Sequence, residues 1–217
     1  MFTGIIEEKA SVENIKDTGE TLVLTILATK IMSDINIGDS IAVNGVCLTV
    51  TSFSETSFTV DVMPETVKAT SLRMLQKGSA VNVERAMPAD GRFGGHFVSG
   101  HVDAAGSIAE IIPHENAVYV KIKVPAQYMK YLTYKGSVAV DGISLTIFGV
   151  NDAEELLTLS IIPHTWKETV LGEKNPGDSV NIECDMLSKY TERILAGVEG
   201  KENSGLTAGV LEQNGYK

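Results

Sequence analysis

Cysteine and histidine are scarce in this sequence, which has two cysteines, Cys47 and Cys184, and four histidines among 217 residues. Two distant cysteines are too few for a disulfide framework, so we expect both to be thiols. The histidines do not follow a zinc-binding pattern, and we expect no metal site. Long hydrophobic runs are also missing, because no segment approaches the roughly 20 apolar residues that a membrane-spanning helix needs.

Positive charge is in short supply as well. The chain has 18 Lys and Arg against 28 Asp and Glu, a formal charge of −10, and no basic cluster. Nucleic acids and anionic membrane surfaces are bound by concentrated positive charge, so both are excluded as partners and a small molecule is the expected ligand. The opening MFTGIIEEKA lacks the basic start and cleavage pattern of a signal peptide, which predicts a cytoplasmic protein.

An internal duplication is the strongest pattern in the chain. The segment Val62–Met87 aligns without a gap with Ile161–Met186, 99 residues later (161 − 62). Upstream, NGVCLTV at Asn44–Val50 matches DGISLTI at Asp141–Ile147, 97 residues later (141 − 44). A repeat of this length indicates two copies of one structural unit, each with its own core.

Each copy has the pattern of short strands separated by glycine-marked turns. Apolar and polar residues alternate most clearly in VYVKIKV at Val118–Val124, and Phe58, Val60 and Val62 follow the same period of two. Short helix-compatible stretches intervene, but the long crossover helices of parallel sheets are missing. We therefore predict a mainly β chain with two tandem six-stranded antiparallel barrels of Greek-key type.

The boundaries of these units follow from composition. Residues 1–97 form the first barrel with its linker, Pro88–Gly95, and residues 98–186 form the second barrel. Residues 187–199 are predicted to be a C-terminal helix, with a narrow apolar stripe made by Leu187, Tyr190, Ile194 and Val198. The polar, glycine-bearing residues 200–217 are predicted to be a flexible tail.

Six motifs occur in order along the chain: MFTGII, NGVCLTV, DVMPET, GGHFVSGH, KGSVAVDGISLT and IIPHTWKETVLG. Together they closely resemble the motifs of the riboflavin synthase family, with its two lumazine-binding repeats, over roughly Met1–Val198. The resemblance implies a transferase. Two molecules of 6,7-dimethyl-8-ribityllumazine exchange a four-carbon unit to give riboflavin and 5-amino-6-(ribitylamino)pyrimidinedione, and neither a metal nor an organic cofactor is used.

The resemblance also implies an assembly. It predicts a homotrimer whose C-terminal helices associate, with each active site between the N-terminal barrel of one subunit and the C-terminal barrel of another. Whether the trimer joins a larger complex with lumazine synthase stays open.

The same resemblance assigns the site residues. Catalytic roles are expected for Cys47, His101, Ser144, Thr146 and Asp185. Contacts with the substrate ring are expected for Gly4, Ile5, Ile6, Cys47, Leu48, Thr49, Gly100, His101, Val102, Ser144, Leu145 and Thr146. The remaining substrate contacts are expected for Ser40, Asp61, Val62, Met63, Pro64, Glu65, Thr66, Lys135, Ser160, Ile161, Ile162, Pro163, His164 and Thr165.

Chemically, the lumazine ring can delocalise a carbanion formed at its C7 methyl group, so the substrate supplies its own electron sink. His101 is the expected proton carrier, because the reference pKa of histidine lies near ~6.5. Positions that differ between the copies should distinguish the donor from the acceptor, since Cys47 corresponds to Ser144 and Ile5 corresponds to His101.

Several residues have a plainer interpretation. Cys184 alternates with inward strand residues and is predicted to belong to the core. His96 is predicted to be a structural hydrogen-bonding residue beside the linker, and His114 a surface residue. His164 stays open between a ligand contact and the rim of the site, and Lys135 between a solvated side chain and a ligand contact.

Two other functions compete with the enzyme. A lumazine-binding antenna protein has the same duplicated fold without catalysis, but this chain keeps the expected catalytic side chains in both copies. A flavin-dependent oxidoreductase would need an additional nucleotide-binding βαβ domain, for which the sequence has no room.

Overall fold

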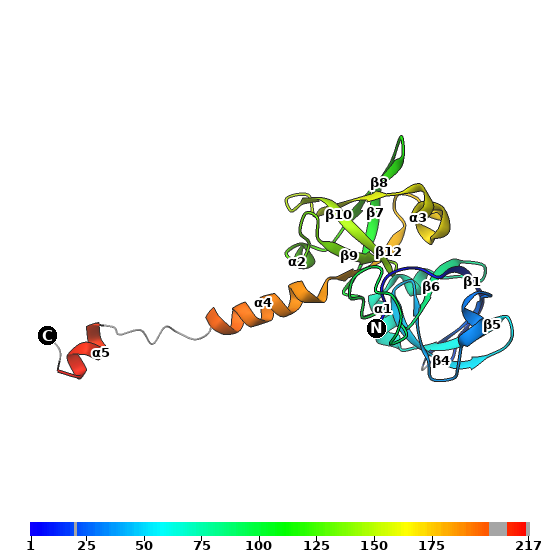
Figure 1. Ribbon diagram of the computed structural model, residues 1–217, viewed down its shortest axis with the longest axis horizontal. Helices are drawn as coiled ribbons and strands as arrows, with labels where there is room; N and C mark the ends of the chain where they lie inside the picture. Colours follow the sequence, from blue (N-terminus) through cyan, green and yellow to red (C-terminus); the bar gives the residue numbers. More distant parts are fainter. Residues whose placement is uncertain (20, 200–207, 216–217) are drawn as a thin grey trace. The chain divides into compact units, whose positions relative to one another are not determined.

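The computed structural model describes residues 1–19, 21–199 and 208–215. The chain divides into two compact units, Met1–Met186 and Leu187–Lys217. The first unit contains two closed antiparallel barrels, each of six strands (Figure 1). The predicted mainly β fold with two six-stranded barrels is therefore confirmed.

The N-terminal barrel has the strand order β1-β2-β5-β4-β3-β6, closed by pairing between β6 and β1. Its strands are β1 (Glu8–Asp17), β2 (Leu22–Leu27), β3 (Ser40–Val43), β4 (Val46–Phe53), β5 (Ser57–Val62) and β6 (Ala80–Arg85). Because β2 pairs with β5 rather than with β3, the connection is of the predicted Greek-key type.

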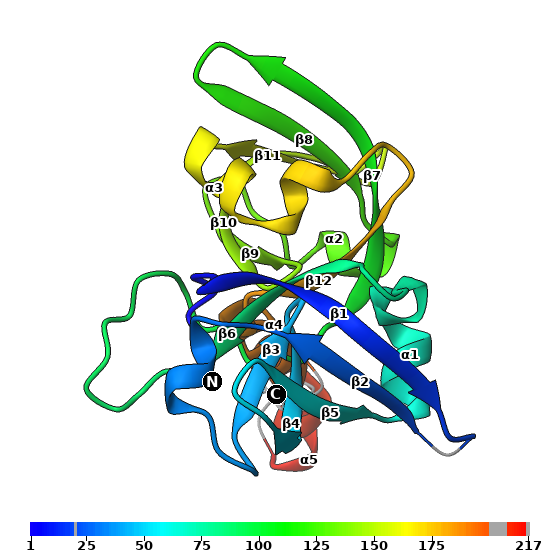
Figure 2. The same cartoon turned by 90° about the vertical axis from the view of Figure 1, so that its right-hand side faces the viewer.

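The second barrel repeats this order with the next six strands, as β10-β11-β8-β7-β12-β9. Its strands are β7 (Ala104–His114), β8 (Ala117–Lys123), β9 (Ser137–Val140), β10 (Ile143–Asn151), β11 (Leu156–Ile161) and β12 (Ser179–Cys184). Figure 2 shows the two barrels side by side, with the β7–β8 hairpin projecting from the second.

Short helices interrupt both barrels at matching places. They are η1 (Ile31–Asp34), α1 (Pro64–Ala69) and η2 (Ser71–Met74) in the first copy, and α2 (Ala126–Met129), α3 (Pro163–Glu168) and η3 (Val170–Glu173) in the second. A proline opens both α1 and α3, where its missing N–H costs no helical hydrogen bond. The predicted short helical stretches are therefore present.

Each barrel is filled by the inward side chains of its alternating strands. Phe58, Val60 and Val62 are fully buried in the first barrel, and Val120 and Ile122 in the second. Burying side chains of this size contributes about 1.5–3 kcal/mol each. Cys184 is also fully buried among the second set, as predicted.

The two barrels meet around an antiparallel bridge between Phe2 and Val98. These residues exchange both backbone hydrogen bonds, at 2.8 and 3.3 Å, and both side chains are fully buried. Ala42 and Ala139, one from each barrel, complete this apolar cluster. The sequence FTGI at Phe2 corresponds to VSGH at Val98, 96 residues later (98 − 2), so the bridge joins equivalent positions of the two copies.

Side-chain amides cross this junction reciprocally. Asn82 Nδ2 donates to the Asp141 carbonyl at 2.9 Å, and Asn181 Nδ2 donates to the Asn44 carbonyl at 2.8 Å. The reciprocity fails at one point, because the second copy has Asp141 where the first has Asn44. Burial raises the pKa of the Asp141 carboxyl, and the ammonium of Lys174, 3.6 Å from Oδ2, opposes that shift.

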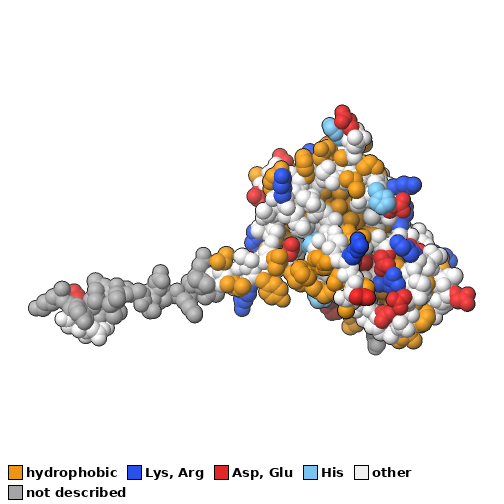
Figure 3. All heavy atoms as spheres, in the orientation of Figure 1, with side chains coloured by type: hydrophobic (Ala, Val, Ile, Leu, Met, Phe, Trp, Pro, Cys, Tyr) orange, Lys and Arg blue, Asp and Glu red, His pale blue; other side chains and the backbone are white. Residues whose placement is uncertain are grey.

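The C-terminal unit contains α4 (Met186–Glu199), which starts at the last residue of the first unit, and α5 (Ala208–Gln213). The predicted C-terminal helix is confirmed, and Leu187, Tyr190 and Ile194 are exposed along it, which agrees with the hydrophobic side chains on its surface in Figure 3. The side chain of Val198 and most of the predicted tail lie outside the described residues. Among those that are described, no helix is long and apolar enough to span a membrane.

Candidate active site

The opening segment of each repeat crosses to the barrel of the other repeat. The Ser144 N–H donates to the Gly4 carbonyl at 2.8 Å, and the Cys47 N–H donates to the Gly100 carbonyl at 2.9 Å. These two contacts join the predicted ring-binding segments into two groups. Each group takes a strand from one barrel and a crossing segment from the other repeat, so each candidate half-site is composite.

Both crossing points require glycine. Gly4 and Gly100 have φ angles of 76° and 82°, in the left-handed region that other residues rarely adopt. A Cβ atom on Gly4 would lie 2.6 Å from the Cβ of Ser144, and one on Gly100 would lie 2.5 Å from the Cβ of Cys47. The backbone of each crossing segment therefore lies directly against a predicted reactive side chain.

The first half-site lies on the outer face of the N-terminal barrel. Strand register places Ser40 on β3 opposite Thr49 on β4. Thr49 follows the half-buried Cys47 by two residues on the same strand. Val50 pairs with Val60, which brings Thr49 beside Asp61 on the next strand. His101 is exposed and follows Gly100, so the crossing segment carries it to this same surface.

The second half-site repeats this arrangement on the outer face of the C-terminal barrel. Ser137 pairs with Thr146, and Ala139 pairs with Ser144. Ile147 pairs with Leu159, which brings Thr146 beside Ser160. Ile5 follows Gly4 and is half-exposed here, in the position that His101 has in the first half-site.

Two buried glutamates hold the crossing segments in place. Glu84 accepts hydrogen bonds from the Thr3 N–H and Oγ1, both at 2.7 Å, and from the Gly4 N–H at 3.0 Å. Glu183 accepts the equivalent bonds from Ser99, at 2.7 and 2.6 Å, and from Gly100 at 3.0 Å. Burial raises the pKa of Glu84 even though these hydrogen bonds favour its ionised form.

A buried histidine contacts Ser144, the serine predicted to be catalytic in the second half-site. His96 Nδ1 lies 2.7 Å from Ser144 Oγ. Burial lowers the pKa of His96, and the negative charge of Asp185 opposes that shift. A neutral imidazole can accept the serine proton, so this contact can orient and activate the hydroxyl. Ser144, His96 and Asp185 therefore form one cluster.

Comparisons with known proteins find the same duplication. The lumazine binding domain family model matches the chain twice, over residues 3–86 and 99–185. The riboflavin synthases of Bacillus subtilis (strain 168) and Actinobacillus pleuropneumoniae are 55% and 52% identical to the chain over 217 residues, and each alignment covers both proteins completely. The chain belongs to the riboflavin synthase family. A crystal structure of LumP complexed with riboflavin has the same fold, with a TM-score of 0.78 and 25% identity over 85% of this chain and 99% of that one.

Within this member of the riboflavin synthase family, the outward side chains of the predicted site fall into the two half-sites. The segments Asp61–Thr66 and Ser160–Thr165 run from the ends of β5 and β11 into α1 and α3, so they flank the first and second half-site, respectively. His164 is exposed at this edge.

Several predicted contact residues have side chains that point away from the outer surface. Leu48, Val62 and Ile161 lie in the barrel cores, while Ile6 packs on the second core and Val102 on the first. Leu145 also packs against the second core. Leu48, Val62 and Ile161, which are buried, can therefore contact a ligand at the outer surface only through their backbone groups, whereas Ile6, Val102 and Leu145 are only partly buried.

Lys135 adopts an unusual backbone conformation beside the second half-site. Its φ angle is 62°, whereas the first copy has Gly38, with a φ of 92°, at the equivalent turn. Both N–H groups make the same bond, to the Ile147 and Val50 carbonyls, respectively. A non-glycine residue in this conformation is strained, and the ligand contact of Lys135 stays a prediction.

Sequence analysis missed two residues of this site. Ser137 is the counterpart of Ser40, and the repeat spacing of 97 would have identified it. His96 is predicted to be a structural hydrogen-bonding residue beside the linker, and its contact with Ser144, 48 residues away, leaves no local pattern in the sequence.

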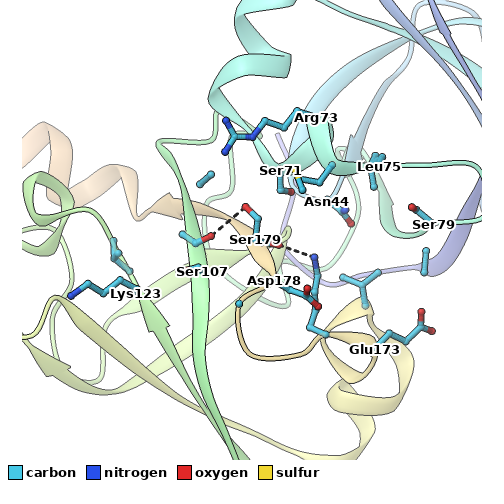
Figure 4. A pocket seen from close by; sticks show the side chains of 18 of the residues that line it. Asn44, Ser71, Arg73, Leu75, Ser79, Ser107, Lys123, Glu173, Asp178 and Ser179 are labelled. Carbon is cyan, nitrogen blue, oxygen red and sulfur yellow. Dashed lines mark hydrogen bonds between the residues drawn. The ribbon is translucent and has the colours of Figure 1, made fainter.

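A cleft of about 770 Å³ lies between the barrels, but it is not the candidate site. It is lined by residues of η2, β7, β12 and η3, including Arg73, Glu173 and Ser179 (Figure 4). None of the predicted site residues is among those that line it. No group of three or more His, Cys, Asp or Glu in the described part of the chain is placed to hold a metal ion.

Proposed function

We propose that this chain makes riboflavin from two molecules of 6,7-dimethyl-8-ribityllumazine, by transfer of a four-carbon unit from one to the other. The observation that carries the proposal is the pair of composite half-sites, each with a crossing glycine against Cys47 or Ser144. Full-length similarity to riboflavin synthases supports it. Two similar half-sites suit a reaction between two identical molecules, because holding both reactants in place contributes about 7–11 kcal/mol to catalysis in favourable systems.

The side chains divide the proton transfers between the half-sites. His101, exposed beside Gly100, takes a proton from the C7 methyl of a bound lumazine and later returns it. Ser144, oriented by His96, lies where a nucleophile adds to the second lumazine, and Cys47 has the corresponding place in the first half-site. Thr146 and Asp185 support the second half-site, by a hydroxyl and by a charge near His96. The remaining predicted residues bind the ring and the ribityl chain through hydroxyls and backbone groups.

A homotrimer completes the proposed active sites. The half-sites are open to solvent at Thr49, Thr146 and His101, so each can receive the half-site of another subunit. The exposed apolar stripe of α4 supplies a surface for association between subunits. We place the enzyme in the cytoplasm, and association with lumazine synthase can be tested by co-sedimentation of the two proteins.

A lumazine-binding antenna protein is the second candidate function, because LumP shares the fold. The two functions differ in one measurable property, since only an enzyme consumes the lumazine. The test is to titrate the purified chain with the lumazine by fluorescence and to follow riboflavin formation in the same samples. Binding with turnover supports the proposal, whereas binding without turnover identifies an antenna-like protein.

The assignment of His101 has its own test. His101→Gln should lower kcat strongly and change ligand affinity little, because the imidazole transfers a proton in the transition state and contributes little to binding of the ground state. Lys77→Gln, at an exposed position away from both half-sites, is the control. Equal turnover in His101→Gln and the control would remove His101 from the mechanism.

A further inference from the structure

Three aromatic rings cluster on the outer face of the second barrel. The ring centroids of Tyr119 on β8 and Phe148 on β10 are 5.2 Å apart, at an angle of 50°. His114, at the end of β7, contacts Tyr119 edge-on at 5.6 Å. Phe148 is 51% exposed, so this cluster faces solvent rather than the core.

Strand register places these rings beside the second half-site. Strand β11 lies between β8 and β10, so Tyr119 and Phe148 lean toward each other over its outer face. Tyr119 pairs directly with Ser160, the outward residue of β11 that lies beside Thr146. Phe148 follows Thr146 by two residues and points to the same face. The rings therefore border the row of polar residues that forms the half-site.

The equivalent strand positions of the first barrel, Val23 and Thr51, carry no aromatic rings. Val23 pairs with Asp61 as Tyr119 pairs with Ser160, and Thr51 occupies the bulge of β4 where Phe148 occupies the bulge of β10. Thr51 uses its hydroxyl in a hydrogen bond to the Thr59 carbonyl. The N-terminal barrel closes with the same topology, so the fold itself does not require an aromatic pair at these positions.

We propose that Tyr119 and Phe148 form an aromatic wall of the second half-site and contact the planar heterocycle of the lumazine or flavin bound there. The inference rests on the proposed function and adds two specificity-determining residues to it. The exposed ring of Phe148 and the partly exposed ring of Tyr119 suit a flat conjugated ring system, which gains from stacked or edge-to-face contacts, whereas a ribityl chain needs hydroxyl and amide partners. The wall makes the two half-sites unequal, because the first has Val23 and Thr51 at the equivalent strand positions.

The experiment grafts the first half-site onto the second. The double substitution Tyr119→Val and Phe148→Thr, in the full-length chain, installs the residues of the first copy. Riboflavin and the lumazine are titrated into wild type and variant by ligand fluorescence and fitted to two classes of site. The ligand affinity of one class of site should weaken by about 3- to 10-fold, which is the effect expected from losing an aromatic pair contact, and the affinity of the other class should not change.

The reverse graft, Val23→Tyr with Thr51→Phe, is the matched control on the first half-site. It should not change the ligand affinity of the class of site that the Tyr119→Val, Phe148→Thr variant weakens. Thermal unfolding of both variants separates a binding effect from a structural one. Unchanged ligand affinities in a folded Tyr119→Val, Phe148→Thr chain would overturn the proposal of an aromatic wall. Equal weakening of ligand affinity at both classes of site, together with a lowered Tm, would overturn it as well. A wild-type chain that binds neither ligand would instead overturn the proposed function.

Discussion

Replacing Glu183 by glutamine is expected to loosen the segment that carries His101 while the chain stays folded. The carboxylate of Glu183 is buried and accepts three hydrogen bonds, two from Ser99 and one from Gly100. A glutamine oxygen can keep the two bonds from Ser99, but its amide N–H₂ then faces the Gly100 N–H. One charge-assisted hydrogen bond is lost, about 1.5–3 kcal/mol, and relief of the buried charge offsets part of it.

The net loss of stability should be about 1–2 kcal/mol, which for a chain of this size lowers Tm by roughly 2–8 °C. Turnover should fall more than ligand affinity, because a displacement of about 1 Å at a reacting group costs up to ~100-fold in rate. Thermal unfolding and steady-state kinetics measure the two effects. Glu84→Gln is the matched comparison, since it loosens Gly4 at the second half-site and leaves His101 in place. A Glu183→Gln chain with unchanged Tm and unchanged kcat would refute the anchoring role.

Three further predictions concern charge and assembly. Burial raises the pKa of Asp141 above its ordinary 3.8, so the native chain keeps a proton that the unfolded chain releases, and the free energy of unfolding should fall as pH rises above 3.8. In urea unfolding between pH 4 and 7, Asp141→Asn should flatten this dependence on pH. An unchanged slope in the variant would contradict the prediction. Burial lowers the pKa of His96 below its ordinary 6.5, so the stability of the wild-type chain should fall as pH drops below 6.5. Because the imidazole is proposed to activate Ser144, His96→Gln should lower kcat at least ~10-fold and remove the acidic limb of the dependence of kcat on pH. Deleting the chain from Leu187 onward should weaken trimer formation and lower activity at dilute protein, and an unchanged trimer in sedimentation would show that the barrels alone hold the assembly.

The barrels were predictable because their determinants are local or repeated. Alternation at Val118–Val124 and at Phe58–Val62 identifies strands within a few residues, and the proline at each DVMPET-like motif starts a short helix. The duplication then extends each local inference to the second copy. Comparison of the copies also identified Cys47 and Ser144 as corresponding positions.

The composite nature of the half-sites was not predictable in this way. Gly4 and Ser144 are 140 residues apart, and nothing local indicates that Gly4 crosses to the other barrel. The contact between His96 and Ser144 was not predictable for the same reason, because the two residues are 48 positions apart in the sequence. The aromatic wall needed the strand register, which alone shows that Tyr119 pairs with Ser160.

The most direct test of the central claim measures stoichiometry. Purified full-length protein is incubated with 6,7-dimethyl-8-ribityllumazine alone, without added metal or nucleotide and in the presence of EDTA, and the lumazine and riboflavin are quantified by absorbance. The two half-sites predict that two equivalents of lumazine disappear for each riboflavin formed, since one molecule donates its four-carbon unit to the other. Tight binding of the lumazine without any riboflavin would contradict the enzymatic account.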